Sequence, residues 1–163
     1  ADLIFQSSDK MRFHIHRKYL QANTGAFLAE IEFEKGMDQM IPLTESSVTL
    51  ELLFSFIYPK RHPELEDMSF EVIEPLAEAA EKYQVFSAMH ICHLRMKEFI
   101  PTHPTEVLNY ACRHDYPFLI SAAAEVAVAL PLAESARLLP PHLVMPWVRA
   151  YLNNWIFKFN RRI

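Results

Sequence analysis

Glycine is nearly absent from this sequence. The 163 residues contain only 2 glycines, Gly25 and Gly36, where average usage gives about eleven. Phosphate-binding loops of the G-x-G-x-x-G and G-x-x-x-x-G-K-[ST] types need several closely spaced glycines, and so does the G-x-S-x-G turn that carries a nucleophilic serine. The sequence therefore argues against nucleotide binding through such loops and against a hydrolase with that turn.

Cysteine is also rare, and long apolar runs are missing. The 2 cysteines, Cys92 and Cys112, cannot form a disulfide framework, and no signal peptide precedes them. We therefore expect a reducing intracellular compartment: the cytoplasm, the nucleus or both. The most apolar stretch, residues 117–133, contains Glu125 and is bounded by prolines, so it is too short and too polar to span a bilayer. No membrane partner is expected. Because the chain starts at Ala1, without Met, inside a predicted strand, we expect a fragment of a longer protein.

The charge balance gives little support for nucleic-acid binding. The net charge is −4, and residues 1–100 carry 10 Lys and Arg against 16 Asp and Glu, whereas residues 101–163 carry 6 against 4. Three basic residues, Lys158, Arg161 and Arg162, lie close to the C-terminus. They are too few to indicate a DNA-binding patch. We expect no nucleic-acid partner for this chain.

The first hundred residues predict a small sheet covered by helices. Alternation of apolar and polar residues predicts a β-hairpin from residues 2–6 and 11–15, and a third strand is predicted at 39–43. A short amphipathic segment spans 16–20, a short helix is expected at about 25–30, and a loop at 35–38. Helical periodicity predicts three longer helices, at 47–58 (capped by Ser46 or Ser47), at 70–83 and at 86–99.

Two prolines, Pro101 and Pro104, mark a boundary beyond which the pattern is all helical. Helices are predicted at 104–113, 117–130 and 132–139, followed by a last segment at 141–159. We therefore expect two domains, an α+β domain over residues 1–100 and a helical extension over 101–163.

The last helical segment contains a proline and an aromatic stripe. Pro146 either kinks this helix or delays its start to about Trp147. Trp147, Tyr151 and Trp155 follow one another at four-residue steps. Aromatic residues at this spacing form either part of a core or an interface whose partner is missing.

One short run holds the residue types of a thiol enzyme. Cys112, His114 and Asp115 could supply a nucleophile, a base and an orienting acid. On a helix, however, side chains two residues apart point in different directions, so Cys112 and His114 face away from each other. We expect a buried structural cysteine and no enzyme, with a small thiol enzyme that uses Cys112 and His114 as the alternative.

Histidine spacing does not predict a metal site. His90 and His93 lie on one helix face, but Cys92 projects from a different side of that helix, and His14 and His16 point to opposite faces of a strand. Zinc requires three or four ligands. We therefore expect no metal ion and no other cofactor.

Taken together, the first hundred residues resemble a BTB/POZ domain. The resemblance is carried by D-L-I-F at residues 2–5, F-H-I-H-R-K-Y-L at 13–20, G-A-F at 25–27, the strand at 39–43, L-L-F-S-F-I-Y at 52–58, L-A-E-A-A-E-K-Y-Q-V at 76–85 and the helix that contains Cys92. The segments are most similar to BTB/POZ proteins of basidiomycete fungi. Residues 101–163 resemble a BACK-like or truncated form of the helical extension that follows BTB domains in ligase adaptors. The resemblance implies the α+β BTB/POZ fold, a small sheet with a β-hairpin covered by a cluster of helices.

The resemblance also implies a function in protein–protein interaction. Members self-associate, often as homodimers, and many dock a cullin scaffold as adaptors of a ubiquitin ligase. A scaffolding or transcription-linked role without cullin binding stays open. For self-association the resemblance points to the first strand and the following short helix, with Asp2, Leu3, Phe5, Arg17, Tyr19 and Leu20.

For a cullin-like partner, the resemblance points to a helix end and the loop after it, with Phe54, Tyr58, His62, Leu65 and Glu66. Cullin-binding members often carry a hydrophobic–x–Glu motif in this loop. Glu66 falls at the position of its glutamate, but the hydrophobic position holds Glu64, and Leu65 lies one residue away.

Asp2 and Arg17 match family positions for a buried or half-buried charge pair beside the dimer groove. Because an unpaired charge there would be costly, Asp2→Ala is predicted to destabilise the fold or the dimer.

Overall fold

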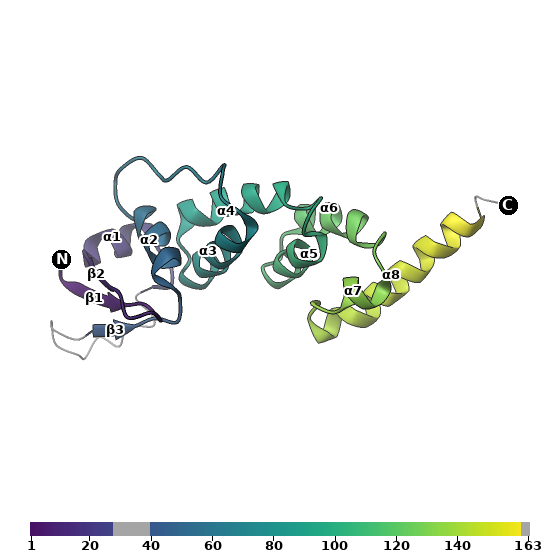
Figure 1. Cartoon of the computed structure of the whole chain (residues 1–163), viewed down its shortest axis with the longest axis horizontal. Coiled ribbons are helices and arrows are strands. Elements are labelled where there is room, and N and C mark those ends of the chain that lie inside the picture. The colour runs from purple at the N-terminus through teal and green to yellow at the C-terminus, as the bar shows by residue number, and fades with distance from the viewer. Residues whose placement is uncertain (28–39, 161–163) are drawn as a thin grey trace. The chain divides into compact units, whose positions relative to one another are not determined.

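The computed structural model describes residues 1–27 and 40–160, and for 155–160 it describes the backbone alone. Most of the helix predicted at 25–30, and the whole loop predicted at 35–38, lie outside these residues. The chain divides into two compact units, Ala1–Arg95 and Met96–Ile163. Each unit is considered by itself below (Figure 1).

The sheet of the first unit has three strands, β1 (Leu3–Gln6), β2 (Arg12–Ile15) and β3 (Met40–Pro42), in the order β2-β1-β3. β1 and β2 form the predicted hairpin, in which Leu3 lies opposite Ile15 and Phe5 lies opposite Phe13. β3 pairs with β1 in parallel. The hairpin and the third strand are thus confirmed, each slightly shorter than the pattern predicts.

The described residues of this unit also form α1 (Arg17–Asn23), α2 (Ser47–Ser55), α3 (Phe70–Tyr83) and most of α4 (Phe86–Glu98), which ends beyond Arg95. Ser46 is the N-cap of α2, since its side chain accepts a hydrogen bond from the Thr49 N–H at 3.3 Å. α2 ends at Ser55, before the predicted end at residue 58. The N–H groups of Phe56 and Ile57 bond to carbonyls three residues earlier, so the last turn tightens and the α-helix stops.

The hairpin turn is fixed to the start of α2. The carboxylate of Asp9 accepts hydrogen bonds from the Ser47 N–H at 2.8 Å and from the Ser47 hydroxyl at 2.5 Å. The side-chain bond from Ser47, together with one from Ser7, lowers the pKa of Asp9 to about 2. An ionised carboxylate is favourable at a helix N-terminus, so this contact orients α2 against the sheet.

Aromatic packing joins the sheet to α2 and α3. The ring of Phe27 lies 5.3 Å from that of Phe5 and 5.8 Å from that of Phe54, and it stacks on Tyr83 at 4.1 Å between centroids. All four side chains are at most 4% exposed. Such aromatic pairs contribute beyond their buried area, so this cluster is the centre of the core.

The second unit contains α5 (Pro104–Arg113), α6 (Pro117–Ala127), α7 (Leu132–Ala136) and α8 (Pro141–Asn160). α6 and α7 each end three residues before the predicted position. α8 begins at Pro141 and continues through Pro146, so a start near Trp147 is wrong. No helix in the described part of the chain is long and apolar enough to cross a membrane.

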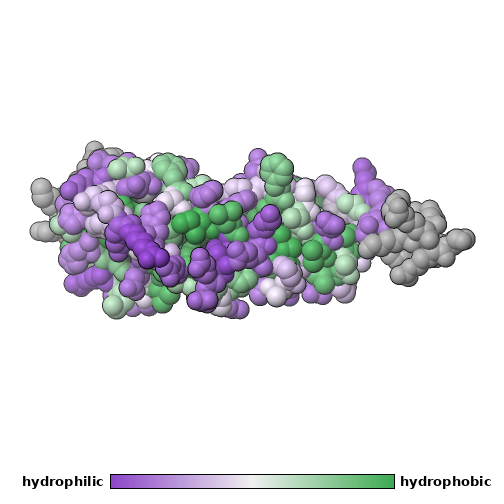
Figure 2. Space-filling view, turned by 90° about the horizontal axis from the view of Figure 1, so that it is seen from above, coloured by the Kyte–Doolittle hydropathy of each residue, from purple (hydrophilic) through white to green (hydrophobic). Residues whose placement is uncertain are grey.

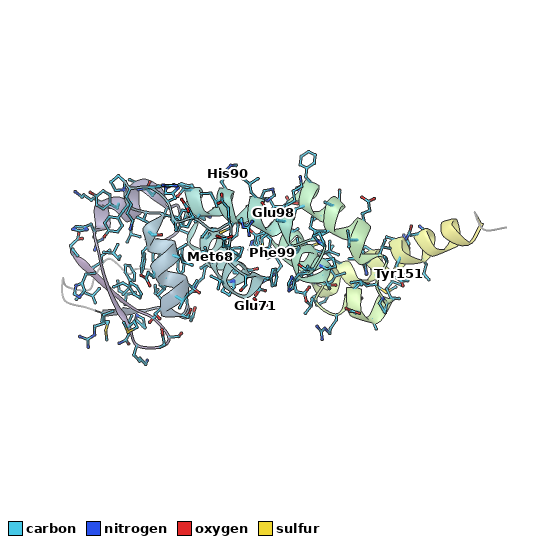
Figure 3. All side chains as sticks on the ribbon, turned by 45° about the horizontal axis from the view of Figure 1, so that its top comes forward. Met68, Glu71, His90, Glu98, Phe99 and Tyr151 are labelled. Atoms are coloured by element: carbon cyan, nitrogen blue, oxygen red, sulfur yellow. The ribbon has the colours of Figure 1, made fainter. Side chains whose placement is uncertain are left out.

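The aromatic stripe of α8 packs within the second unit. The indole N–H of Trp147, which is 9% exposed, donates to the Ser135 hydroxyl at 3.0 Å. The hydroxyl of Tyr151, labelled in Figure 3, donates to the Leu130 carbonyl at 3.0 Å. The core interpretation therefore holds for Trp147, whereas the side chain of Trp155 lies outside the described residues.

Candidate interaction site

An open apolar groove runs along the outer face of α2. It has a volume of about 580 Å³ and is lined by Phe13, Val48, Glu51, Leu52, Phe54, Ser55, Tyr58, Lys60, Pro63, Met68 and Val72. Val48 is 58% exposed. Figure 3 shows Met68 beside α2 at the start of α3. Glu51 and Lys60 are the charged residues of the lining, so an apolar floor carries one acidic and one basic group.

A second groove adjoins the first one through two shared residues. It has a volume of about 600 Å³ and is lined by Tyr19, Ala22, Asn23, Phe56, Tyr58, Pro59, Lys60, His62 and Ser87. Tyr58 and Lys60 line both grooves. The structure thus brings Tyr19, predicted for self-association, next to Tyr58 and His62, predicted for a partner.

Tyr58 is held in place by contacts with α1 and with His16, the residue before α1. Its hydroxyl accepts a hydrogen bond from the His16 N–H at 3.3 Å and lies 3.0 Å from His16 Nδ1. Its ring centroid is 4.9 Å from that of Tyr19. The Asn23 side-chain amide donates to the Tyr19 carbonyl at 3.0 Å and to the Ile57 carbonyl at 2.9 Å. These contacts fix the ridge between the two grooves.

Asp2, the residue before β1, caps α1. Its Oδ1 accepts a hydrogen bond from the backbone N–H of Arg17 at 2.8 Å, and this bond lowers the pKa of Asp2 below its ordinary value. In the single chain Arg17 is half-buried and Asp2 is exposed. Burial of this pair beside a dimer groove stays a prediction.

The predicted self-association residues divide between surface and core. Asp2 is exposed and Arg17 and Tyr19 are half-buried, so these three are available at the surface. The apolar members, Leu3, Phe5 and Leu20, are 6%, 0% and 0% exposed. They pack beneath the surface and support it rather than form it. Whether the surface binds a second copy stays a prediction.

The predicted partner-binding residues divide in the same way. Tyr58 and His62 are half-buried and Glu66 is exposed. Leu65 is 3% exposed, so its side chain belongs to the core and is not available to a partner. Phe54 is 4% exposed and lines the groove from below. The loop is tied down because the Glu66 carbonyl accepts a hydrogen bond from Arg95 Nη2 at 2.8 Å.

Sequence reasoning missed the floor of the groove. The helical pattern places Val48 and Leu52 on the covered side of the helix together with Leu53, but Val48 is largely exposed and Leu52 is half-buried. The sequence does contain an indication of this groove. A helix with one buried face needs apolar residues on that face only, whereas α2 carries apolar residues on two faces. Figure 2 shows that hydrophobic and hydrophilic residues are mixed over the face seen there.

The thiol and histidine candidates have no supporting arrangement. Burial raises the pKa of Cys112, and burial together with the charge of Glu81 raises the pKa of Cys92 to about 12. A reactive cysteine needs a lowered pKa, so neither thiol has the properties of a nucleophile. His90 is exposed on α4 (Figure 3), and the described part of the chain contains no cluster of three His, Cys, Asp or Glu that could hold a metal ion.

Comparison with known proteins identifies the first unit. A family model for the BTB/POZ domain matches residues 1–100. No curated protein matches the chain. BTB/POZ domains are generally interaction modules rather than enzymes. From the family match and the fold together, this chain belongs to the BTB/POZ domain family and carries a protein–protein interaction module.

Proposed function

We propose that the chain is the adaptor part of a cullin-type ubiquitin ligase, with the groove along α2 as the docking site for a helix of the cullin scaffold. The observation that carries this proposal is the apolar lining of that groove, which includes the exposed side chain of Val48. In this proposal residues 1–100 are the docking domain, and residues 101–163 are a BACK-like extension. The proposal places the protein inside the cell, in the cytoplasm, the nucleus or both, and among BTB/POZ proteins of basidiomycete type.

The chemistry of the groove supports a helical partner. Amphipathic helices bind in grooves by inserting apolar residues at three- and four-residue steps. Val48 is 58% exposed, and its complete burial by a partner would contribute about 1 kcal/mol. Glu51 and Lys60 flank the apolar floor and would set the orientation of a partner helix through charge pairs. The partial motif around Leu65 and Glu66 does not carry the proposal, because Leu65 is buried.

Self-association is the second part of the proposal. Asp2, Arg17 and Tyr19 lie on one surface at the start of α1, and the ridge at Tyr58 continues it. A homodimer through Asp2, Arg17 and Tyr19 would lie beside the α2 groove, because Tyr58 also lines that groove. A scaffolding or transcription-linked protein would use the same self-association surface without a cullin, so the two roles differ at the groove.

Titration calorimetry with the N-terminal region of the host's BTB-binding cullin tests the proposal. Val48→Asp places a charge on the groove floor and is expected to weaken binding at least about tenfold. Phe118→Asp is the matched control, because Phe118 lies on α6 and is 91% exposed. Equal affinities of wild type and Val48→Asp, or no binding by wild type, would reject the α2 groove as a cullin site. Retained dimer mass in that case would favour the scaffolding role.

A further inference from the structure

β2 forms a basic edge of the sheet. Between residues 10 and 18 the sequence has four Lys and Arg and no Asp or Glu, in a chain whose net charge is −4. The side chains of Lys10 and Arg12 are exposed on the hairpin, and so is that of His14, which follows them in β2. Two carboxylates close in sequence, Asp9 and Asp2, are engaged with the N-termini of α2 and α1.

The outer edge of β2 presents backbone groups for pairing. The Met11 carbonyl accepts from the Ser7 N–H at 2.9 Å and the Ile15 carbonyl from the Asp2 N–H at 3.2 Å, so both point toward β1. Because backbone groups alternate along a strand, those of Arg12 and His14 point away from β1. In the described part of the chain the sheet order ends at β2.

The two faces of β2 differ in chemistry. Arg12 and His14 are exposed on one face, whereas Met11, which is 56% exposed, and Phe13, which is half-buried, lie on the other. A strand that paired with this edge would meet basic side chains at every second position and apolar ones between them. Opposite charges in cross-strand pairs are stabilising. The matching sequence therefore alternates acidic and apolar residues.

The same charges disfavour a second copy of this chain at this edge. Lysine and arginine on edge strands prevent edge-to-edge association of identical sheets, because like charges come together. An acidic segment experiences the opposite effect, since each positive charge that repels a second copy attracts a carboxylate. The edge is therefore selective for a partner of opposite charge.

We propose that the outer edge of β2 binds an extended segment of a partner protein, with alternating acidic and apolar residues, by β-strand addition. The edge adjoins the α2 groove, whose lining includes Phe13 of β2, and it is followed along the chain by Arg17. The outward backbone groups of Arg12 and His14 belong to neither surface, so the inference goes beyond the adaptor function and does not depend on it.

Fluorescence anisotropy with a labelled peptide of about eight alternating glutamate and valine residues tests the proposal. We expect saturable binding that weakens with added salt. Arg12→Glu is expected to weaken binding at least about tenfold, whereas Lys97→Glu, an exposed lysine of the other unit, has no effect. A peptide with N-methyl groups at alternate residues lacks the backbone N–H donors along one edge of its strand. It is also expected to bind at least about tenfold more weakly than the unmodified peptide.

A pair of substitutions at His14 separates strand addition from simple charge attraction. His14→Pro removes an outward N–H that makes no bond to β1, so the hairpin tolerates it, whereas His14→Gln keeps the N–H. We expect a loss of binding for His14→Pro of at least about tenfold relative to His14→Gln. Circular dichroism checks that both variants fold, and the N-methylated peptide tests the same point on the unaltered protein.

Three results would overturn the proposal. The first is absence of saturable binding to wild type. The second is equal binding of the N-methylated and unmodified peptides, which would reduce the contact to charge attraction. The third is a dimer of the chain that His14→Pro converts to a monomer, since a second copy would then occupy the edge.

Discussion

The hydroxyl of Tyr83 gives a sharp test of the packing around α3. Tyr83 is 1% exposed, and its hydroxyl donates to Glu45 Oε2 at 2.7 Å and accepts from Lys82 Nζ at 2.8 Å. Tyr83→Phe removes the hydroxyl and keeps the ring stacked on Phe27. A hydrogen bond to a charged group contributes about 1.5–3 kcal/mol. Because Glu45 keeps its bond from Lys82 at 2.9 Å, and Lys82 is 39% exposed, we expect a loss of about 1–2 kcal/mol.

This loss depends on pH through the ionisation of Glu45. Burial would raise the pKa of Glu45, but hydrogen bonds from Lys82 and Tyr83 outweigh it and hold the pKa below its ordinary value of 4.5. A carboxyl group with a lowered pKa contributes stability above its unfolded pKa and loses it as pH falls through the folded pKa. The deficit of Tyr83→Phe is therefore complete near neutral pH and shrinks once the pH falls below 4.5.

Urea denaturation at neutral pH and at about pH 3 measures this deficit. Far-UV circular dichroism follows both units, whereas tryptophan fluorescence follows only the second, because the 2 tryptophans are Trp147 and Trp155. Tyr151→Phe is the control, since the Tyr151 hydroxyl donates to a neutral carbonyl, and its effect should not follow the titration of Glu45. A Tyr83→Phe deficit under about 0.3 kcal/mol at neutral pH, or an equal deficit at both pH values, would refute the reasoning.

Three further predictions concern the ends of helices and the thiols. Asp2→Ala removes the carboxylate that caps α1 and should lower the melting temperature or the dimer mass, and no change in either would contradict the capping role. Asp9→Asn should lower stability at neutral pH. Because the pKa of Asp9 falls from 3.8 to about 2 on folding, the difference from wild type should vanish as pH falls through that interval, which denaturation at several pH values checks. Iodoacetamide at neutral pH should label Cys92 only after unfolding and Cys112 more slowly than a free thiol, as mass spectrometry of native and unfolded protein would show. Rapid labelling of native Cys112 would revive the thiol-enzyme alternative.

The spacing of apolar residues in the sequence was sufficient to predict β2 and α3. The alternation of Met11, Phe13 and Ile15 predicts β2 because alternate residues of a strand share one face. Ile15 is buried and Phe13 is half-buried, and the register places Phe13 opposite Phe5, whereas Met11 precedes the strand and is 56% exposed. The bounds of α3 were also predictable. Its apolar stripe is continuous from Phe70, and Gln84 ends it in the left-handed region at a φ of 51°.

Tertiary contacts decided what the pattern could not. The apolar periodicity of α2 continues through Ile57, but the Ile57 carbonyl accepts from Asn23, a contact across 34 residues of sequence, and the helix stops earlier. The α2 groove is likewise made of residues from β2, α2 and the start of α3. Sequence spacing alone could not show that Val48 stays uncovered while Leu53 is 0% exposed.

The resemblance indicates where in the fold the candidate site residues lie, but not which of their side chains are exposed. The resemblance names Tyr58 and His62, and the structure places both in the lining of one groove, because family motifs locate a segment of the fold. It could not separate them from Leu65, since motif letters do not tell which apolar side chain closes the core. The pairing of Tyr58 with His16 is a contact between segments 42 residues apart, which no motif records.

Size-exclusion chromatography with light scattering shows whether the chain binds a cullin through the α2 groove. The chain is run alone and mixed with the N-terminal region of its host's BTB-binding cullin, as wild type and as Val48→Asp. We predict a co-eluting complex for wild type, whose mass equals that of the 19.0 kDa chain or its dimer plus a whole number of cullin fragments, and no complex for Val48→Asp. A wild-type chain that elutes as a monomer and forms no complex, or a complex that survives Val48→Asp, would contradict this prediction.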